Sequence, residues 1–263
     1  MSDILLQERQ AGIARLTLND PKTRNSLSEA MMAELVVALD DLRRDDTARV
    51  IVIAAEGPAF CSGHNLKEIT AHRQDDDRGA AYFTKLMAQC ATLMQGIVHH
   101  PLPVIAEIQA VASAAGCQLV ASCDLAIAAE PVRFATPGVN IGLFCSTPMV
   151  ALSRNVTAKH AMEMLLTGDL IDAEDARRIG LINRIVPSQF LRQSVDELAA
   201  KIASKSKAVT KIGKEAFYRQ REMTLPDAYD YAARVMVENL LIRDAEEGIG
   251  AFVDKRPPEW QDR

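Results

Sequence analysis

Apolar residues occur along this chain in two patterns: short runs, and longer stretches in which they recur every three or four positions. Residues 13–18 alternate between apolar and polar side chains, which is typical of a half-buried strand. Residues 50–54 form a continuous apolar run that suits a buried parallel strand, and residues 104–108 and 125–129 are similar. Because helical patterns and short links separate these runs, we predict an α/β fold with parallel strands and right-handed crossovers.

The longer stretches predict amphipathic helices. The sequence Ser26-Leu27-Ser28-Glu29 has the spacing of a capping box and predicts the start of the first helix. A second helix is predicted over 80–98, and a short helix over 114–122 has a first turn of small residues. The polar stretch at 72–79 predicts a solvated loop. The apolar stripe of the first helix consists of Leu27, Met31, Leu35, Ala38 and Leu42.

From residue 157 onward the pattern becomes mainly helical. Asp172 is expected to cap one helix and Gly180 to end it. The change of pattern predicts two parts, an α/β core over residues 1–195 and a C-terminal helical region over residues 196–263. Three helical patterns occupy the end of the chain, near 188–204, 208–221 and 226–245.

Composition narrows the class of protein. A chain of 263 residues with 48% hydrophobic and 25% charged residues is ordinary for a soluble globular protein with a large core. Its net charge of -5 argues against nucleic acid or an anionic membrane as a partner. The N-terminus lacks the basic and apolar regions of a secretory signal, and no apolar run reaches about 18 residues. We therefore expect a cytoplasmic protein.

The five cysteines do not form a recognisable binding or disulfide pattern. Their number is odd, and no two of them are spaced as CxxC, so neither a disulfide framework nor a zinc site is expected. All of them lie among apolar or small residues, which predicts buried, reduced thiols. They are Cys61, Cys90, Cys117, Cys123 and Cys145.

Two segments rich in small residues are candidates for holding a negatively charged oxygen. The first covers residues 59–68, and the second covers 114–124, with 134–138 just beyond it. Ala115 lies at a predicted helix start, where backbone N–H groups have no intrahelical partner and the helix dipole favours an anion. By themselves, the same turns also fit tight packing without any ligand.

These segments carry a resemblance to a known family, the crotonase superfamily of enoyl-CoA hydratases and isomerases. The order and spacing of the landmarks together make the resemblance specific, and it extends over nearly the whole chain. The combination of Gln118, Gly138 and residues 142–147 is similar to one subgroup in particular. The matching landmarks are residues 16–27, 60–68, 103–106, 116–119, 123–128, 166–168, 175–176, 180–183 and 251–256.

The resemblance implies a fold, a ligand and an assembly. The fold is an α/β crotonase-like (ββα) spiral core followed by a C-terminal helical trimerisation region. The ligand is an acyl-CoA thioester, and coenzyme A enters as part of that substrate, with no separate cofactor or metal. Because the family's C-terminal helices pack across a neighbouring subunit, a homotrimer or a dimer of trimers is implied.

The resemblance also assigns catalytic positions. It gives the two oxyanion donors as the backbone N–H groups of His64 and Ala115. Gln118 and Gly138 stand where the family pattern has two glutamates. An amide has no usable pKa and glycine has no side chain, so neither can transfer a proton. An aspartate that a related dehalogenase branch places near Ser146 is absent too.

Further positions are implied to contact the substrate. Cations suit the phosphates of coenzyme A, and the resemblance places Lys22, Arg24, Lys67 and Lys255 along it. Residues that could act near the acyl group are His64, Asn140, Cys145 and Ser146.

Two of these side chains, those of His64 and Cys145, could take part directly in the reaction. The side chain of His64 either lines the pocket or transfers protons, and the sequence leaves both roles open. Cys145 as a nucleophile would need an activating base, and the sequence shows none nearby.

The sequence therefore predicts an acyl-CoA-binding enzyme of the enoyl-CoA hydratase/isomerase family that lacks efficient two-glutamate hydration. Two alternatives stay open. One is a non-catalytic acyl-CoA binder or modulator of fatty-acid metabolism. The other is an acyl-CoA thioester hydrolase in which Gln118 holds the attacking water.

Overall fold

Two β-sheets form the centre of the molecule, which the computed structural model describes over residues 4–263. The larger sheet has six strands in the order β1-β2-β3-β5-β7-β10. β1 and β2 are antiparallel, and the other neighbouring strands are parallel, as predicted. The strands are β1 (Leu5–Gln10), β2 (Ile13–Leu18), β3 (Val50–Ala55), β5 (Val104–Ile108), β7 (Leu125–Ala129) and β10 (Arg184–Val186).

A second, smaller sheet has the strand order β4-β6-β8-β9. β6 is parallel to both β4 and β8, whereas β8 and β9 are antiparallel. The strands are only two or three residues long, so no periodicity reveals them, and the sequence did not predict this sheet. They are β4 (Ala59–Cys61), β6 (Val111–Ser113), β8 (Arg133–Ala135) and β9 (Ile171–Asp172).

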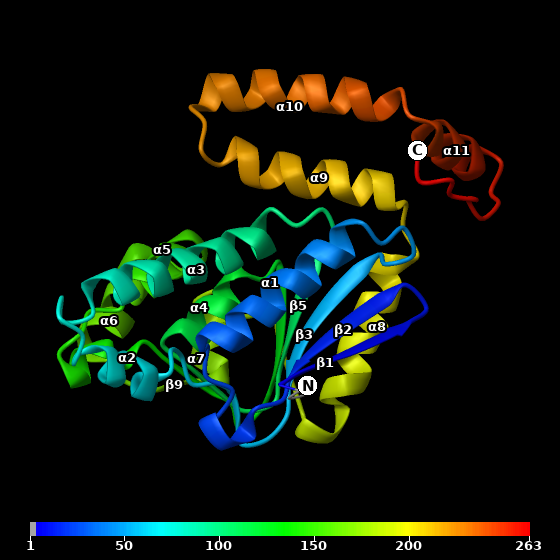
Figure 1. The fold of residues 1–263 in the computed structure, drawn as a ribbon. Helices are drawn as coiled ribbons and strands as arrows, with labels where there is room; N and C mark the ends of the chain where they lie inside the picture. The colour runs from blue at the N-terminus through cyan, green and yellow to red at the C-terminus, as the bar shows by residue number, and fades with distance from the viewer. Residues whose placement is uncertain (1–3) are drawn as a thin grey trace.

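Helices surround both sheets. In Figure 1 the larger sheet lies between α1 and α8, which explains why every residue of β3 is buried. The helices are η1 (Pro21–Thr23), α1 (Glu29–Arg43), α2 (Leu66–His72), α3 (Ala80–Val98), α4 (Ala115–Ser122), η2 (Pro137–Ile141), α5 (Ser146–Asn155), α6 (Ala158–Thr167), α7 (Ala173–Arg178), η3 (Ser188–Phe190), α8 (Leu191–Ala203), α9 (Lys207–Gln220), α10 (Leu225–Leu240) and α11 (Arg243–Val253).

The first helix shows where the sequence prediction succeeded and where it was wrong. All five residues of its predicted apolar stripe are at most 1% exposed. The helix is capped by Ser28, whose side chain accepts a hydrogen bond from the Met31 N–H at 3.1 Å, and not by Ser26. Ser26 instead precedes the helix, and its buried hydroxyl has no hydrogen-bond partner among residues 4–263.

The polar segment between α2 and α3 is a chain of turns with the exposed side chains that the sequence predicted. Asp77 orders its end, because its carboxylate accepts hydrogen bonds from the N–H groups of Gly79 and Ala81 at 2.9 and 2.8 Å. Further along the chain, Asp172 caps α7 as predicted by accepting from the Asp175 N–H.

The C-terminal region begins differently from the prediction. α8 continues across the predicted boundary at 195/196 and packs against β3, β5 and β7 of the large sheet. The division into two parts stays a prediction, and the helices that leave the core are α9, α10 and α11 (Figure 1). The segment expected to be one helix over 226–245 is interrupted, because α10 ends at Leu240 and α11 starts at Arg243.

A partly buried ion pair ties α9 to the core. The Lys214 Nζ lies 2.6 Å from the Asp124 Oδ2 and also donates to the carbonyl oxygens of Ile97 and Leu102. Tyr218, one turn further along α9, donates its hydroxyl to the other carboxylate oxygen of Asp124 at 2.8 Å. α9 is therefore fixed beside the ends of α3 and α4.

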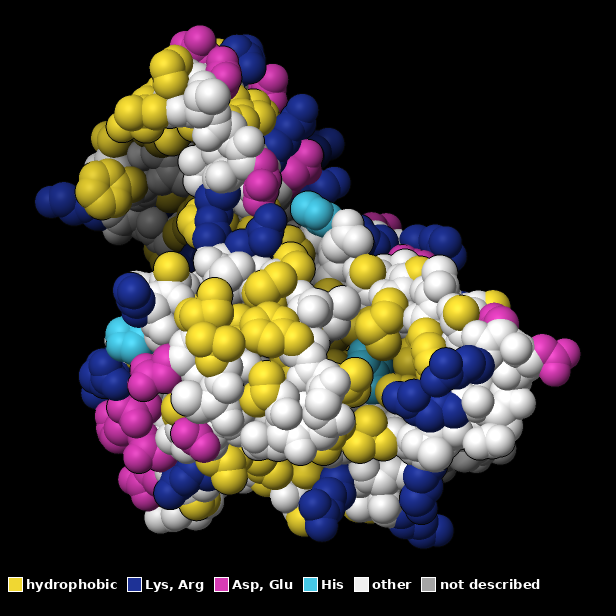
Figure 2. Space-filling view, turned by 90° about the vertical axis from the view of Figure 1, so that its left-hand side faces the viewer, with side chains coloured by type: hydrophobic (Ala, Val, Ile, Leu, Met, Phe, Trp, Pro, Cys, Tyr) yellow, Lys and Arg dark blue, Asp and Glu magenta, His cyan; other side chains and the backbone are white. Residues whose placement is uncertain are grey.

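The helices beyond α9 expose apolar side chains. Figure 2 shows hydrophobic side chains gathered on the C-terminal helices at the top of the view. Tyr229, Leu241, Phe252 and Val253 are each at least 70% exposed. A helix with such a face needs another surface to cover it.

Candidate functional site

Three parallel strands of the small sheet place the two small-residue turns and the Gly138 segment side by side. β4 leads into Ser62–Asn65, β6 leads into Ala114 and α4, and β8 leads into Thr136 and η2. Because β6 lies between β4 and β8, the start of α4 lies between the other two segments. Segments from three parts of the sequence thus meet at one edge of the sheet.

The two turns are in direct contact. A side chain at Gly63 would place its Cβ 2.9 Å from the Ala114 Cβ and 3.2 Å from the Ala115 N. A Cβ at Gly116 would lie 2.1 Å from the Cys61 carbonyl oxygen, so only glycine fits there. Because Gly63 and Gly116 have no side chains, the ends of β4 and β6 can approach each other.

The backbone N–H groups of His64 and Ala115 are both available to a ligand. Neither donates a hydrogen bond to any residue within 4–263. Ala115 is the first residue of α4, where such a group has no intrahelical acceptor. The packing of Gly63, the neighbour of His64, against Ala115 places the two segments that carry these donors side by side.

Ala114 holds an unusual backbone conformation between these donors. Its φ is 50° and its ψ is -118°, a region that L-residues with a side chain rarely adopt. Such strain costs on the order of 1–3 kcal/mol and persists only where the surroundings impose it. Here the Ala114 N–H is held by the Ala135 carbonyl oxygen at 2.9 Å, and α4 begins at the next residue.

The side chain of His64 is neutral and has one free ring nitrogen. Its Nδ1 lies 3.3 Å from the Leu27 carbonyl oxygen, which can only accept, so Nδ1 carries the proton. The Nε2 is buried and has no hydrogen-bond partner among residues 4–263. Burial holds the pKa of His64 below its usual value, although the nearby Glu68 carboxylate opposes this effect.

Gln118 points into the interior one helical turn after Ala115. Its side chain is 5% exposed, and its Oε1 lies 3.8 Å from the Cys90 Sγ. Burial raises the pKa of the Cys90 thiol to about 11, so this thiol stays protonated and is a weak donor. The Gln118 position therefore holds a neutral amide in neutral surroundings.

Gly138 has no room for a side chain. A Cβ at this position would lie 2.6 Å from the Leu143 carbonyl oxygen and 2.9 Å from the Cys145 Sγ. The Leu143 N–H also donates to the Gly138 carbonyl oxygen at 2.9 Å, which holds the 143–145 loop against η2. The loop thus fills the space that a longer side chain would need.

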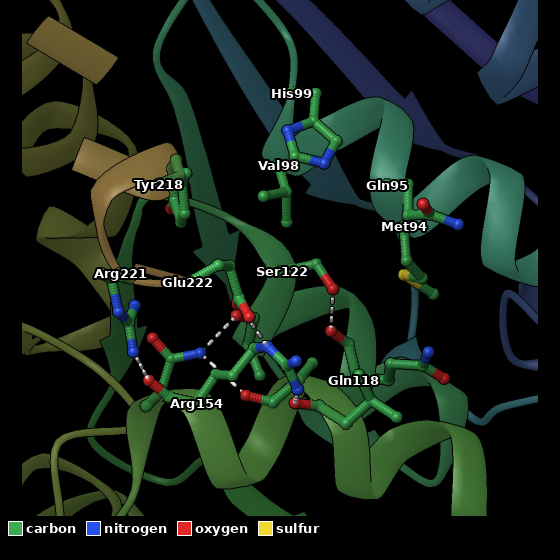
Figure 3. A pocket seen from close by; sticks show the side chains of 14 residues that line it. Met94, Gln95, Val98, His99, Gln118, Ser122, Arg154, Tyr218, Arg221 and Glu222 are labelled. Atoms are coloured by element: carbon green, nitrogen blue, oxygen red, sulfur yellow. Dashed lines mark hydrogen bonds and ion pairs between the residues drawn. The ribbon is translucent and has the colours of Figure 1, made fainter. Parts of the chain in front are cut away.

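A cavity of about 340 Å³ lies next to Gln118, between α3, α4, α5 and α9. In Figure 3, Gln118, Met94 and Gln95 lie on one side of this cavity, and Arg221 and Tyr218 lie on the other. Gln118 is the only residue predicted as a site residue that lines it. The remaining side chains come from helices that the sequence did not connect with one another.

The predicted phosphate contacts fall into two groups. Lys22 and Arg24 lie beside the first turn, since the Ser62 N–H donates to the Arg24 carbonyl oxygen at 3.1 Å. Lys67 lies in the first turn of α2, just after His64. Lys255 follows α11, and this helix lies at the opposite end of the molecule from α2 (Figure 1).

The other predicted pocket residues are not gathered at one place. Cys145 is buried against Gly138, and burial raises the pKa of its thiol, which agrees with the predicted lack of an activating base. Asn140 is exposed, and its Nδ2 faces Gly168. Ser146 is exposed at the start of α5, where its hydroxyl donates to the Phe144 carbonyl oxygen at 3.3 Å. All five cysteines are free and buried, as predicted.

Comparison with known proteins assigns the family. A family model described as enoyl-CoA hydratase/isomerase matches residues 8–263. The chain belongs to the enoyl-CoA hydratase/isomerase family. It is 48% identical over 253 residues to the mitochondrial enoyl-CoA hydratase domain-containing protein 3 of Xenopus laevis, covering 96% of this chain and 84% of that protein. The corresponding Homo sapiens protein is 47% identical over 249 residues, covering 95% and 80%.

Solved structures of this family agree with the fold. A crystal structure of enoyl-CoA hydratase from Mycobacterium smegmatis matches with a TM-score of 0.94 at 46% identity, over 98% of this chain and 99% of that chain. The human enoyl-CoA hydratase domain-containing protein 3 matches with a TM-score of 0.93 at 45% identity, over 98% and 100%. The predicted family and the crotonase fold are therefore confirmed, and the subgroup that the sequence resembles is that of enoyl-CoA hydratase domain-containing protein 3.

The names of two relatives bear on the expected cellular location. The proteins from Xenopus laevis and Homo sapiens are named as mitochondrial, which differs from the cytoplasmic location expected for this chain. Within residues 4–263 no helix is both long and apolar enough to span a membrane. The cytoplasmic location stays a prediction.

The sequence did not predict several residues that lie near the site. Arg154 on α5, and Arg221 and Glu222 just after α9, line the cavity, yet nothing in their spacing connects them. Their meeting depends on how α9 docks beside α5. Glu68 lies one turn after His64, and its Oε2 accepts a hydrogen bond from the Tyr82 hydroxyl at 3.5 Å. The helical pattern of residues 66–72 could have indicated the position of Glu68.

Proposed function

We propose that this protein is an enzyme that binds an acyl-CoA thioester and stabilises negative charge on the thioester oxygen. The backbone N–H groups of His64 and Ala115 are the donors. Negative charge develops there when the α-carbon loses a proton, when a nucleophile adds to the β-carbon, or when the carbonyl is attacked. Two fixed donors lower the barrier in all three cases.

The observation that carries this proposal is the contact between the two turns. Gly63 lies against Ala114 and Ala115, and both proposed donors have no acceptor among residues 4–263. The strained Ala114 supports the same interpretation, because strain of this kind clusters at functional sites. Lys22, Arg24 and Lys67 would then hold the phosphates of coenzyme A beside the first turn.

Efficient hydration of a 2-enoyl-CoA is not part of the proposal. At the two positions where the resemblance implies glutamates, the chain has the amide of Gln118 and the crowded Gly138. Each positioned proton-transfer group supplies about 10²–10⁴-fold in rate. We therefore expect turnover of crotonyl-CoA far below the ~10 s⁻¹ of a typical enzyme.

The assembly proposed is a homotrimer or a dimer of trimers. The exposed apolar side chains of α10 and α11 need a covering surface, and the resemblance supplies an adjacent copy. Because Lys255 lies at the far end of its own chain, it would reach coenzyme A only in the site of a neighbouring copy. Asn140, Cys145 and Ser146 would line the pocket only if η2 and the 143–145 loop adjust to the ligand.

A proline substitution tests the donor at Ala115. Proline lacks the N–H, so Ala115→Pro removes the donor from α4. Because the residue before a proline favours an extended conformation, which Ala114 with φ 50° and ψ -118° does not have, thermal melting must show that the variant is folded. We expect the rate with any acyl-CoA that the parent turns over to fall by about 10²–10³-fold. The matched control is Ala158→Pro at the exposed start of α6, which should leave that rate unchanged.

A panel of acyl-CoA thioesters, assayed for products and for binding by calorimetry, separates the alternatives. Binding without any product would favour the non-catalytic binder, and release of free coenzyme A would favour the hydrolase. Absence of binding to every thioester would contradict the proposal. An unchanged rate in a folded Ala115→Pro variant would remove this N–H from the site.

A further inference from the structure

The cavity beside Gln118 has an apolar wall and a charged far end. The wall comes from the three helices α3, α4 and α5, and its members are apolar side chains of small or medium size. At the other side, two arginines and one glutamate come together from α5 and the end of α9 (Figure 3). The apolar wall consists of Met94, Val98, Ala121, Val150 and Ala151.

The cavity lies along α4 beyond the proposed oxyanion donor, with Gln118, Ala121 and Ser122 of this helix in its wall. Ala115 begins this helix, Gln118 lies one turn later, and Ser122 ends it. With a rise of about 1.5 Å per residue, Ser122 lies roughly 10 Å beyond Ala115. An extended chain of single bonds advances about 1.2 Å per bond, so about eight carbons would span this length.

The charged end holds an excess of positive charge. The Arg154 Nε lies 3.4 Å from the Glu222 Oε1, and the Arg221 Nη2 donates to the Arg154 carbonyl oxygen. Two guanidinium groups and one carboxylate therefore line this end of the cavity, and of the two arginines only Arg154 pairs with the carboxylate. The side chains of the Arg154–Glu222 pair are 52% and 68% exposed, and such a pair is weak and easily exchanged.

We propose that this cavity takes an acyl chain of about eight carbons whose far end carries a carboxylate. The carboxylate pairs with Arg154 and Arg221, and the carbons before it lie along the apolar wall. The inference rests on the proposed function, because the thioester end must be held at Ala115. It adds the substrate class, a CoA thioester of a dicarboxylic acid.

The chemistry of the far end favours a carboxylate over a methyl group. A methyl group placed between two guanidinium groups would remove water from them without offering a partner. A carboxylate accepts two parallel hydrogen bonds from an arginine, which is the strongest pairing available to that side chain. The methylene groups in the middle of the acyl chain strengthen binding whether the chain ends in a methyl group or a carboxylate, by about fourfold per buried methylene.

Calorimetry with two thioesters of equal length tests the inference. One probe is the CoA thioester of a straight monocarboxylic acid of about eight carbons, and the other is the mono-CoA thioester of the dicarboxylic acid of the same length. At low ionic strength we expect the carboxylate-ended probe to bind about two- to fivefold more tightly. The preference should disappear at about 1 M salt, where the screening length falls to about 3 Å.

Four variants test whether the preference comes from the two arginines. Arg154→Gln and Arg221→Gln should each abolish or reverse it by weakening the carboxylate-ended probe. Arg219→Gln removes the same charge from α9 but lies over the Tyr231 ring, 5.0 Å from its centroid, so it should keep the preference. Ala151→Leu fills the apolar wall and should weaken both probes alike. Thermal melting confirms that each variant is folded.

The outcomes distinguish the two proposals. Equal binding of both probes overturns the carboxylate assignment and leaves the proposed function standing. Failure of both probes to bind, in a protein that binds no other acyl-CoA, overturns both proposals. A loss of preference in Arg219→Gln equal to that in Arg154→Gln would show a general charge effect and would also overturn the assignment.

Discussion

The α/β core and the C-terminal helices contain similar apolar patterns but satisfy them differently. In the core, the stripe of α1 and the whole of β3 are buried within the chain itself. In the C-terminal helices, no residue within Lys207–Gln220 or Leu225–Leu240 is buried. Large side chains there, such as Phe252 at 86% exposure, remain in contact with solvent.

This difference shows that an amphipathic pattern predicts a helix but not what covers it. The core helices find the sheets, because those strands present complementary apolar faces. α9 reaches the core through the Lys214–Asp124 pair, while α10 and α11 extend beyond it. A second copy of the chain is the covering surface that the proposed trimer provides.

Two helical glycines give the sharpest test of the contrast. Gly116→Ala in α4 would bring a Cβ within 2.1 Å of the Cys61 carbonyl oxygen, so we expect a loss of about 3 kcal/mol or more in the free energy of unfolding. Gly213→Ala in α9 would meet no atom of residues 4–263 within 4 Å, and we expect a gain of about 0.5–1 kcal/mol. Urea denaturation of both variants measures these changes. Equal effects would show that α4 can move away from β4.

Charges on the exposed apolar face test the need for a partner. Leu241→Asp together with Phe252→Asp places two carboxylates at side chains that are 80% and 86% exposed. We expect this pair to shift the mass in light scattering from a multiple of 28.8 kDa to 28.8 kDa itself. The control Val37→Asp changes a 58% exposed side chain on α1 and should leave the mass unchanged. A parent protein that is already monomeric at micromolar concentration would contradict the trimer.

Restoring the acids tests whether the core still resembles a hydratase. We expect Gln118→Glu with Gly138→Glu to raise hydration of crotonyl-CoA at least about tenfold, and each single change much less, because the two groups act as a unit. The Gly138 change must displace the 143–145 loop, so we expect it to cost about 1–3 kcal/mol of stability. Rate measurements and melting curves check both effects. A folded double variant without any gain would show that the pocket shape has also diverged.

The smallest expected effect concerns the contribution of one copy to the site of another. Lys255→Glu replaces a cation near a phosphate with an anion, and we expect acyl-CoA affinity to fall about two- to fivefold at low salt. Calorimetry measures the affinity, and light scattering shows that the assembly is intact. The same substitution at the exposed Lys159 on α6 is the control. An affinity unchanged by Lys255→Glu would remove this residue from the site.

The sequence predicted much of the core because its signals are local. The strands at 13–18, 104–108 and 125–129 and the helix at 80–98 coincide with β2, β5, β7 and α3. Each carries its own periodicity or apolar run, so no distant contact is needed to recognise it. The small sheet was missed because its strands are too short to show a pattern, although they place all three segments of the candidate site.

The candidate site could be predicted only in part. The motif around Gly63 and Gly116 indicated two turns with free N–H groups, since both the glycines and the helix start are visible in the sequence. The crowding at Gly138 could not be foreseen, because Leu143 and Cys145 return to it through a loop whose path depends on η2 and α5. The arginines of the cavity are likewise brought together only by the docking of α9.

By itself, the sequence determined the family and the core elements, because identity and local periodicity do not depend on distant contacts. Only the tertiary structure decided that Gly63 touches Ala115, that Gly138 has no space for a side chain, and that α11, which precedes Lys255, lies at the opposite end of the molecule from α2. These facts depend on the packing of segments that are far apart in the chain, and the steric limits on such packing become apparent only when all of them are in place.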